Sequence, residues 1–461
     1  MKEYFGKNIL KYQDQIIEDL TELVAIPSVA EASAGGPPFG EQSARALRWI
    51  LNRAQELGLA TVNVGDYAGH AEYGSGEAVA AVVTHVDVVP AGEGWTGEPY
   101  VLEKRDGRLY GRGTADDKGA AVAALYCLKA LKDEGVEGRR RIRAVFGAGE
   151  EIASDDLKRY FQQEALPELA FTPDAEYGIC NREKGILHVE LSAPGENDGL
   201  LKAFSGGTVR NAVPASARAA VSCTKEERRQ LESLAEKLDG EFSFQPGEQG
   251  LEISSKGRAA HAMEPHKGKN AAAQLLRLLS SRFEDRPLGG LWDFLAQKIG
   301  LELDGSALGI CQADDVSGPL TVNIGVAETD GGMCRAVLDI RYPVTADGGT
   351  VFEKIQAAAK PYGVRARVLA EQKPLFVPED TPLISMLKGA YQAVTGEEAA
   401  LYGTGGGTYA RSLQNRGVAF GPVFPGEENH LHDADEFVDV EKFMTHAQIC
   451  LETMYRMMTQ P

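Results

Sequence analysis

The sequence predicts an α/β protein in which a mostly parallel sheet flanked by helices is interrupted by an inserted α+β segment. From the N-terminus to about residue 180, strand-like apolar runs such as 79–83 alternate with helical runs such as 120–131. Alternation of this kind is typical of parallel sheets covered by helices. After Lys184 the pattern changes to two successive sets of strands and helices. We interpret these two sets as related subunits of one inserted domain.

The expected elements follow in order from hydrophobic periodicity. Ile9, Tyr12, Ile16 and Leu20 recur at spacings of three and four, which predicts a helix over 9–25 that ends before Pro27. Within the insertion we expect strands at 208–223, 251–256, 320–326, 334–341 and 364–369, and helices at 226–238, 270–281 and 351–359. Two helices, 383–394 and 440–457, close the chain.

The length of 461 residues favours two domains, because single hydrophobic cores stop growing at roughly 250–300 residues. A group of histidines lies in the final stretch of the chain, which we therefore expect to rejoin the first domain. The predicted boundaries are 1–184 with 373–461 for the first domain, and 185–372 for an inserted lid domain.

Composition excludes several classes of function. The net charge of −19 argues against a nucleic-acid partner, which requires a positive surface. His85, Asp87 or glycines interrupt the most apolar stretches, and the N-terminal residues lack the pattern of a secretion signal. The six cysteines have no C-x-x-C spacing. We therefore expect a cytoplasmic protein with reduced thiols and no membrane partner.

Short clusters of metal-ligand type follow the strand-like runs of the first domain. They are His85-Val86-Asp87, Asp116-Asp117 in a glycine-rich turn, Glu150-Glu151, Asp174, and His430-Leu431-His432. Open α/β sheets collect ligands at the carboxyl ends of their strands. Carboxylates brought together raise one another's pKa unless a cation balances them. The clusters therefore predict a two-metal hydrolase site.

Each cluster suggests roles for its members. His85 is expected to bind a metal while Asp87 holds the other ring nitrogen. Asp116 is expected to bridge two metals, and Asp117 is either part of the site or a helix N-cap. Glu150 and Glu151 point in different directions, which suits one metal ligand and one general base.

Histidines and glycines outside these clusters are more ambiguous. His432 is favoured as a ligand because Glu436 follows it at the fourth position, which leaves His430 as a loop residue. His261 and His266 do not match H-E-x-x-H and would be surface histidines on their own. The glycine-rich segment 403–408 lacks the lysine of a P-loop, so it is either a flexible turn or a cradle of amides for a carboxylate.

Taken in order, these motifs resemble the dinuclear zinc peptidases of the aminoacylase and dipeptidase superfamily. The likeness is greatest to its PepV-type bacterial dipeptidases. It extends beyond the clusters to Ala260-His261-Ala262-Met263-Glu264-Pro265, to Leu338-Asp339-Ile340-Arg341-Tyr342-Pro343, and to Gly405-Gly406-Gly407-Thr408-Tyr409. It covers nearly the whole chain.

The resemblance implies a role for each candidate residue. One metal would be bound by His85, Asp116 and Asp174, and the other by Asp116, Glu151 and His432. Glu150 would be the general base, with Asp87 assisting, and His261 would stabilise the oxyanion. The substrate carboxylate would be held by Arg341 and the loop of Gly405, Gly406 and Gly407, with help from Asn211. The resemblance also implies a cis peptide bond between Asp116 and Asp117.

The activity that the resemblance implies is hydrolysis of dipeptides with free termini, by a water molecule that bridges two divalent metal ions. Zinc is the expected metal, with manganese or cobalt as alternatives. The resemblance also implies that the second set of strands and helices in the insertion occupies the place of a partner subunit's α+β unit, so we expect a monomer.

The alternative activity is that of an N-acyl-amino-acid deacylase or a succinyl-diaminopimelate desuccinylase. The resemblance associates an aspartate at position 174 with dipeptidases. A binding protein without catalysis is disfavoured because every expected ligand is present, and a serine hydrolase because no G-x-S-x-G occurs.

Overall fold

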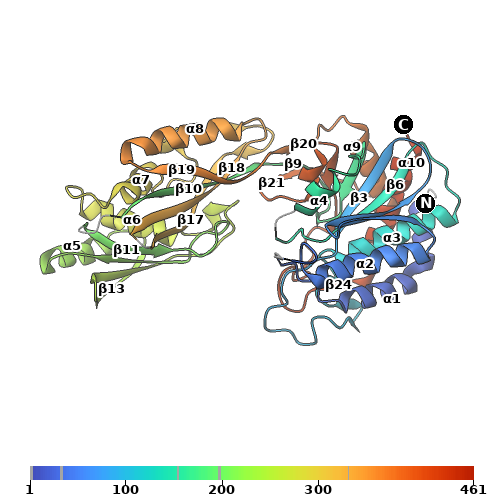
Figure 1. Cartoon of the computed structure of the whole chain (residues 1–461), viewed down its shortest axis with the longest axis horizontal. Coiled ribbons are helices and arrows are strands. Elements are labelled where there is room, and N and C mark those ends of the chain that lie inside the picture. Colours follow the sequence, from blue (N-terminus) through green and yellow to red (C-terminus); the bar gives the residue numbers. More distant parts are fainter. Residues whose placement is uncertain (1–3, 32–34, 153–154, 196–198, 331) are drawn as a thin grey trace. The chain divides into compact units, whose positions relative to one another are not determined.

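The computed structural model describes residues 4–31, 35–152, 155–195, 199–330 and 332–461. The chain forms two compact units. The first unit comprises Met1–Asn181, Leu375–Tyr402 and Gly407–Pro461, and the second comprises Arg182–Pro374 and Gly403–Gly406. The C-terminal part of the chain thus belongs to the same unit as its N-terminal part (Figure 1).

A nine-stranded mixed sheet forms the centre of the first unit. Its strands, in spatial order, are β1 (Ala60–Val64), β2 (Ala68–Tyr73), β6 (Arg141–Gly147), β3 (Val79–His85), β7 (Leu169–Thr172), β22 (Gly417–Ala419), β9 (Ile179–Glu183) and β20 (Leu375–Phe376), with β21 (Leu401–Thr404) also on β9. The expected α/β class is confirmed. Parallel pairing joins β6, β3, β7 and β22, whereas β1, β2 and β9 pair antiparallel. The sheet is therefore less parallel than the sequence suggests.

Strand β3 shows why these residues form the centre of the sheet. All seven of its residues are buried, and a strand covered on both faces reads as a continuous apolar run. Helix α3 (Lys118–Asp133) packs on β2, β3 and β6 and also contacts α1 and α10. The remaining helical segments of this unit are η1 (Phe5–Tyr12), α1 (Gln13–Val24), α2 (Glu41–Glu56), α4 (Asp155–Tyr160), α9 (Pro382–Thr395), η5 (Tyr409–Leu413) and α10 (Val440–Thr459). The helix expected over 9–25 thus begins as a 3-10 helix.

Two small sheets complete the first unit. One joins β24 (Phe437–Asp439), β5 (Arg108–Tyr110) and β4 (Glu103–Arg105), and the other pairs β23 (Pro422–Val423) with β8 (Ala175–Glu176). The first of them links the segment before Asp116 to the segment after His432.

The second unit is built on one eight-stranded antiparallel sheet. Its strands, in spatial order, are β13 (Glu241–Gly247), β14 (Gly250–Lys256), β12 (Ser216–Val221), β11 (Leu201–Gly206), β17 (Thr321–Asp330), β18 (Met333–Tyr342), β10 (Gly185–Pro194) and β19 (Arg365–Gln372). Pairing of β11 with β17 joins the two strand-helix sets into this single sheet. Strand β13 was absent from the elements expected from sequence.

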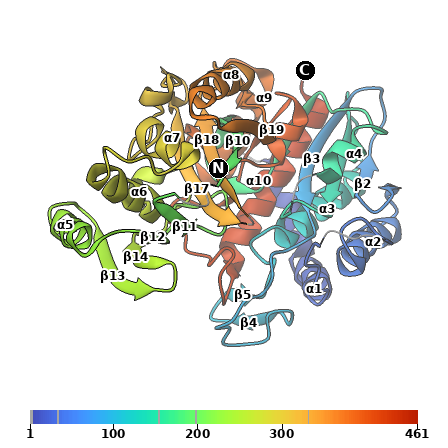
Figure 2. The same ribbon diagram turned by 60° about the vertical axis from the view of Figure 1, so that its left-hand side comes forward.

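Helices cover one face of this sheet. They are α5 (Lys225–Ala235), α6 (Ala271–Arg282), α7 (Gly290–Lys298) and α8 (Gly348–Ala359), which share a core with the inward-facing strand residues (Figure 2). Shorter elements are η2 (Pro265–Lys267), η3 (Ser306–Leu308), η4 (Lys360–Tyr362), β15 (Ala313–Asp314) and β16 (Gly318–Pro319). Leu338 and Ile340 of β18 face the core, so Asp339 and Arg341 lie on the opposite face.

Two further observations concern the whole described chain. Among the described residues, no helix combines the length and apolar character that crossing a membrane requires. All six cysteines lie in the described part of the chain, and none of them is in a disulfide bond.

Candidate metal centre

The strand ends of the first unit place the predicted site residues next to one another. His85 is the last residue of β3, and Glu150-Glu151 and Asp174 follow β6 and β7 closely. These three strands are parallel neighbours, so their carboxyl ends lie at one edge of the sheet. Asp116 directly precedes Asp117, the N-cap of α3.

Two groups of ligand-type atoms meet at this edge. In one group, ligand atoms of His85, Asp116 and Asp174 all lie within 4.8 Å of one another. In the other, the same holds for Asp116, Glu151 and His432. The structure therefore brings together the same two sets of residues that the resemblance implies as metal ligands.

Asp116 belongs to both groups and presents a different oxygen to each. Its Oδ1 lies 3.0 Å from Nε2 of His85, and its Oδ2 lies 2.9 Å from Nε2 of His432. Nε2 of His432 also lies 3.4 Å from Oε1 of Glu151. This is the arrangement needed for one carboxylate to bridge two cations.

The carboxylate of Asp87 holds the glutamate pair as well as the histidine. Oδ1 accepts a hydrogen bond from the backbone N–H of Glu150 at 3.1 Å, and Oδ2 accepts one from Glu151 at 3.0 Å. Nδ1 of His85 lies 3.0 Å from the backbone oxygen of Asp87 and 3.4 Å from its Oδ1. Asp87 thus connects the end of β3 to the turn that carries both glutamates.

The side chain of Asp117 does not cap α3. The residue occupies the N-cap position, but its side chain makes no capping hydrogen bond. Oδ2 instead accepts the backbone N–H of His85 at 3.1 Å. Asp117 therefore holds the N-cap position without capping the helix through its side chain. The peptide bond between Asp116 and Asp117 is cis, as expected.

Burial and crowding of carboxylates dominate the electrostatics of this edge. Burial, together with Asp174, raises the pKa of Glu150 well above its usual value. Burial, together with Asp116, raises the pKa of Asp174 in the same way. Hydrogen bonds from His432 and His85 outweigh burial and lower the pKa of Asp116. The hydrogen bond to Asp116 raises the pKa of His432 to about 10.

The donor set fits divalent metal ions. Two imidazoles and three carboxylates make a mixed nitrogen and oxygen shell of the kind that zinc accepts. Glu150 and Asp174 are buried beside other carboxylates, and burial together with this like charge raises their pKa, so their ionised forms lack a balancing positive charge. Bound cations would supply that balance.

A buried tyrosine supports the turn before Glu150. The hydroxyl of Tyr409 donates to Asp156, which also accepts the N–H of Gly149 at 3.0 Å. The ring of Tyr409 meets His85 edge-on at 6.1 Å between centroids. Sequence analysis gave Tyr409 and Asp156 no role in the site, because nothing in their local pattern places them near the clusters.

Asn211 and His261 are neighbours in the second unit. A β-bridge joins Ala212 to His261, and the backbone N–H of Ala262 donates to the oxygen of Asn211 at 2.9 Å. Nδ1 of His261 accepts the N–H of Met263 at 3.1 Å, and burial and Arg341 lower the pKa of the ring. The neutral imidazole therefore carries its proton on Nε2, ready to donate a hydrogen bond.

Arg341 is held by an aspartate that sequence analysis did not single out. Nε and Nη2 donate to Oδ1 and Oδ2 of Asp339 at 2.6 and 2.7 Å, and Nη1 donates to the oxygen of Gly405 at 2.7 Å. Oδ2 of Asp339 also lies 3.0 Å from Nε2 of His188. The alternation of Asp339 and Arg341 on one strand face was the signal that could have revealed this pair.

The remaining predicted residues have plainer surroundings. The N–H of Gly406 donates to Oγ1 of Thr404 at 2.9 Å, and Gly407 belongs to the first unit. Nδ1 of His430 lies 3.1 Å from the oxygen of Ala434, and this residue belongs to neither ligand group. His266 is exposed in η2.

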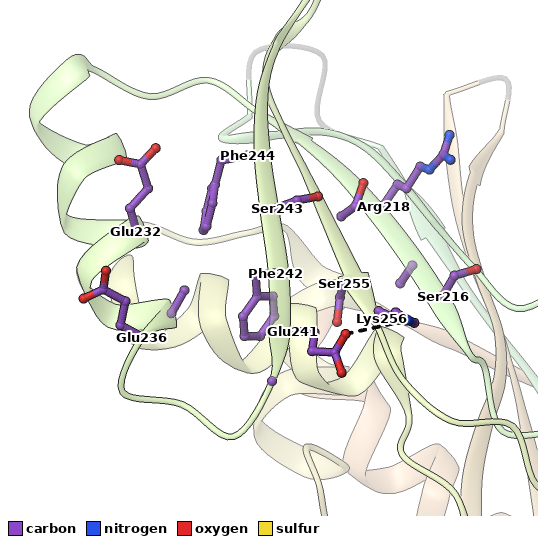
Figure 3. A pocket seen from close by; sticks show the side chains of 14 residues that line it. Ser216, Arg218, Glu232, Glu236, Glu241, Phe242, Ser243, Phe244, Ser255 and Lys256 are labelled. Carbon is purple, nitrogen blue, oxygen red and sulfur yellow. Dashed lines mark ion pairs between the residues drawn. The ribbon is translucent and has the colours of Figure 1, made fainter.

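A groove of about 910 Å³ lies elsewhere in the second unit, between α5 and strands β12 to β14. Figure 3 shows Glu232 of α5 and Glu236, which directly follows α5, on one side of the groove, and Phe242 and Phe244 of β13 on the other. The residues that line this groove include none of the predicted site residues, and Glu241 and Lys256 form an ion pair at its edge. Its size therefore does not make it the candidate site.

Comparison with known proteins extends over nearly the whole chain. The chain is 34% identical over 462 residues to the protein named Putative dipeptidase YtjP of Bacillus subtilis (strain 168), covering 97% of this chain and 98% of the relative. It is also 34% identical over 466 residues to Putative dipeptidase SH1171 of Staphylococcus haemolyticus (strain JCSC1435), with the same coverage.

Solved structures share the fold at lower sequence identity. Human carnosine dipeptidase 1 aligns with a TM-score of 0.59 at 15% identity, over 98% of both chains. The M20 family metallo-carboxypeptidase Sso-CP2 from Sulfolobus solfataricus aligns with a TM-score of 0.60 at 17% identity, over 96% of this chain and 99% of the other. The model of peptidase family M20/M25/M40 matches residues 81–456. The resemblance seen in the sequence is thereby confirmed: the chain belongs to peptidase family M20/M25/M40.

Proposed function

We propose that this peptidase is a metal-dependent dipeptidase that hydrolyses dipeptides with free N- and C-termini. The observation that carries the proposal is the pair of ligand groups that share Asp116, with Glu150 beside them. The relatives that align over 97% of the chain bear the name dipeptidase. Nucleic acid and membranes have no part in the proposed function.

Two divalent metal ions are proposed to bind this edge, one at His85, Asp116 and Asp174 and the other at Asp116, Glu151 and His432. We favour zinc, with manganese or cobalt as substitutes. When bound, two such ions polarise the scissile carbonyl and acidify water.

Glu150 is the proposed general base. Its backbone is fixed by Asp87, and its carboxylate takes a proton from the attacking water and delivers it to the leaving amine. Asp87 therefore acts by holding both the base and the adjacent ligand Glu151 in place.

The second unit is proposed to act as an inserted lid domain, 185–372, on a catalytic domain formed by 1–184 and 373–461. Nε2–H of His261 would stabilise the oxyanion that forms on the scissile carbonyl. Arg341, Asn211 and the segment of Gly405, Gly406 and Gly407 would hold the substrate's C-terminal carboxylate. Arg341 keeps N–H groups for this purpose beyond those that bind Asp339 and Gly405.

We also propose that the enzyme acts as a monomer in the cytoplasm. None of its six cysteines, all of them described, is in a disulfide bond, which suits a reducing compartment. Mixing inactive His261→Ala with inactive Glu150→Gln tests the monomer: the mixture should stay inactive. Recovered activity would mean that the histidine acts on the partner's site.

A substrate comparison tests the proposed activity. We expect a higher kcat/KM for a free dipeptide than for the corresponding N-acylated amino acid. A preference for the acylated substrate would overturn the dipeptidase assignment in favour of a deacylase or succinyl-diaminopimelate desuccinylase.

A further inference from the structure

Arg112 is a buried cation in the first unit that contacts several loops. Its side chain is 1% exposed, and Nη1 donates to Oε2 of Glu436 at 2.6 Å. Nη2 donates to the backbone oxygens of Ala91 at 3.1 Å and Asp433 at 3.2 Å. The guanidinium also lies over the ring of Trp95, at 5.2 Å from its centroid. One side chain therefore ties the loop after β3 to the loop before β24.

Glu436 binds the segment that contains Asp116. Its Oε1 accepts backbone N–H groups from Gly113 at 3.0 Å, Ala115 at 2.9 Å and Asp116 at 3.2 Å. Its own backbone oxygen accepts the N–H of Gly111 at 3.0 Å. The carboxylate is 1% exposed, so the glycine-rich turn is folded around it.

Each of the three segments held by this ion pair carries or adjoins one ligand-type residue, namely His85, Asp116 or His432. Ala91 lies in the loop that leaves His85, the N–H of Asp116 is bound directly, and Asp433 follows His432 in the chain. Each of these contacts is to backbone, so each one fixes the path of the chain beside a ligand.

Stability alone is a poor explanation for this pair. Removing two charges from water costs about as much as their attraction returns, so buried ion pairs add little net stability. Backbone contacts to three ligand-bearing loops have a different consequence, because they restrict the distances between the ligand atoms.

We propose that Arg112 and Glu436 are positioning residues that set the spacing of His85, Asp116 and His432, and thereby the affinity of the site for divalent metal ions. The inference rests on the proposed metal centre. It assigns Arg112 and Glu436 a supporting role in that centre, in which neither side chain has to contact the metal or the substrate.

The test uses metal-stripped full-length protein with Zn²⁺ as the probe. Binding is measured by competition with a chelating dye, and thermal unfolding of the stripped protein is recorded in parallel. Glu436→Gln places an amide group against backbone N–H donors, and Arg112→Lys keeps the charge but loses the forked contact. We expect both variants to bind Zn²⁺ about 10- to 100-fold more weakly, as for other supports of metal ligands.

The matched control is another ion pair of the same unit, between a buried arginine and a half-buried glutamate. Arg143 is 7% exposed, and its Nε lies 2.5 Å from Oε2 of Glu72 on the neighbouring strand, with neither residue in a ligand group. Arg143→Lys and Glu72→Gln should lower the unfolding temperature as much as the test variants do, while Zn²⁺ affinity stays within about threefold of wild type.

Glu436→Asp covers the case in which Glu436→Gln fails to fold, since it keeps the charge and withdraws the carboxylate by one methylene. Zn²⁺ affinity equal to wild type in the folded test variants would overturn the inference, and so would an equal loss in the controls. Wild-type protein that binds no Zn²⁺, or His432→Ala that binds like wild type, would instead refute the proposed metal centre and the inference with it.

Discussion

Replacing Asp87 by Asn tests how the metal ligands are held. The carboxylate of Asp87 is fully buried and accepts the N–H groups of Glu150 and Glu151. An asparagine of the same shape keeps one oxygen for one of these amides and turns an NH₂ group toward the other. One amide then loses its acceptor, and the turn that carries the glutamates must shift.

The size of the effect follows from the bond that is lost. A hydrogen bond to a charged group contributes about 1.5–3 kcal/mol. If this free energy holds the glutamate turn in its metal-binding position, its loss weakens metal affinity by about 10- to 150-fold, since 1.4 kcal/mol is a factor of ten.

The assay is a Zn²⁺ titration of metal-stripped Asp87→Asn, with Asp19→Asn as the control. Asp19 is also buried, and it accepts hydrogen bonds from Nε of Arg53 and the hydroxyl of Tyr126, both at 2.8 Å. The control should bind Zn²⁺ as the wild type does. Wild-type affinity in Asp87→Asn, or an equal loss in Asp19→Asn, would refute the reasoning.

Three further predictions concern catalysis, substrate binding and stability. Glu150→Gln should keep its metal and lose about 10²- to 10⁴-fold in kcat, whereas Glu151→Ala should lose metal content, and the reverse pattern would exchange their roles. Asp339→Asn should weaken the hydrogen bonds that orient the guanidinium of Arg341, and should therefore raise KM for dipeptides far more than it changes kcat. An unchanged KM in steady-state kinetics would count against binding of the substrate carboxylate by Arg341. Burial lowers the pKa of His446 from 6.5 to about 3, so its neutral form stabilises the fold above pH 6.5, and this contribution is lost as the pH falls from 6.5 toward 3. In urea unfolding, His446→Gln should reduce the fall in unfolding free energy between pH 7 and pH 5 by about 2 kcal/mol, and an unchanged fall would contradict this.

The ligand groups were predictable because local sequence patterns mark the ends of buried strands. The apolar run before His85 identifies β3, and the runs before Glu150 and Asp174 identify its parallel neighbours. Residues that follow such strands meet at one edge whatever the exact register. The assignment of ligand and base roles came from the resemblance to a known family.

The supports of the ligands were not predictable from local patterns. Arg112 and Glu436 are 324 residues apart in the chain, and Tyr409 and Asp156 are 253 apart. Their pairing depends on how loops pack after the sheet has formed. Asp117 does occupy the N-cap position of α3, but its carboxylate accepts the buried N–H of His85 and does not cap the helix, and this contact was not predictable for a similar reason.

In the second unit, predicting helices and strands one at a time from the sequence did not give the whole sheet. The two strand-helix sets were visible, but strand β13 and the pairing of β11 with β17 were not. Strand β13 alternates exposed and half-buried residues over Glu241–Gln245, but Phe242 and Phe244 are its only large apolar residues, so its hydrophobic signal is short. Only the structure therefore shows that strands of both sets form a single sheet.

The most direct test of the account is the dependence of dipeptide hydrolysis on metal. The kcat/KM for a free dipeptide should fall to background after exhaustive chelation and return when Zn²⁺, Mn²⁺ or Co²⁺ is added back at two equivalents per chain. Full activity in protein shown to contain no metal would contradict the account.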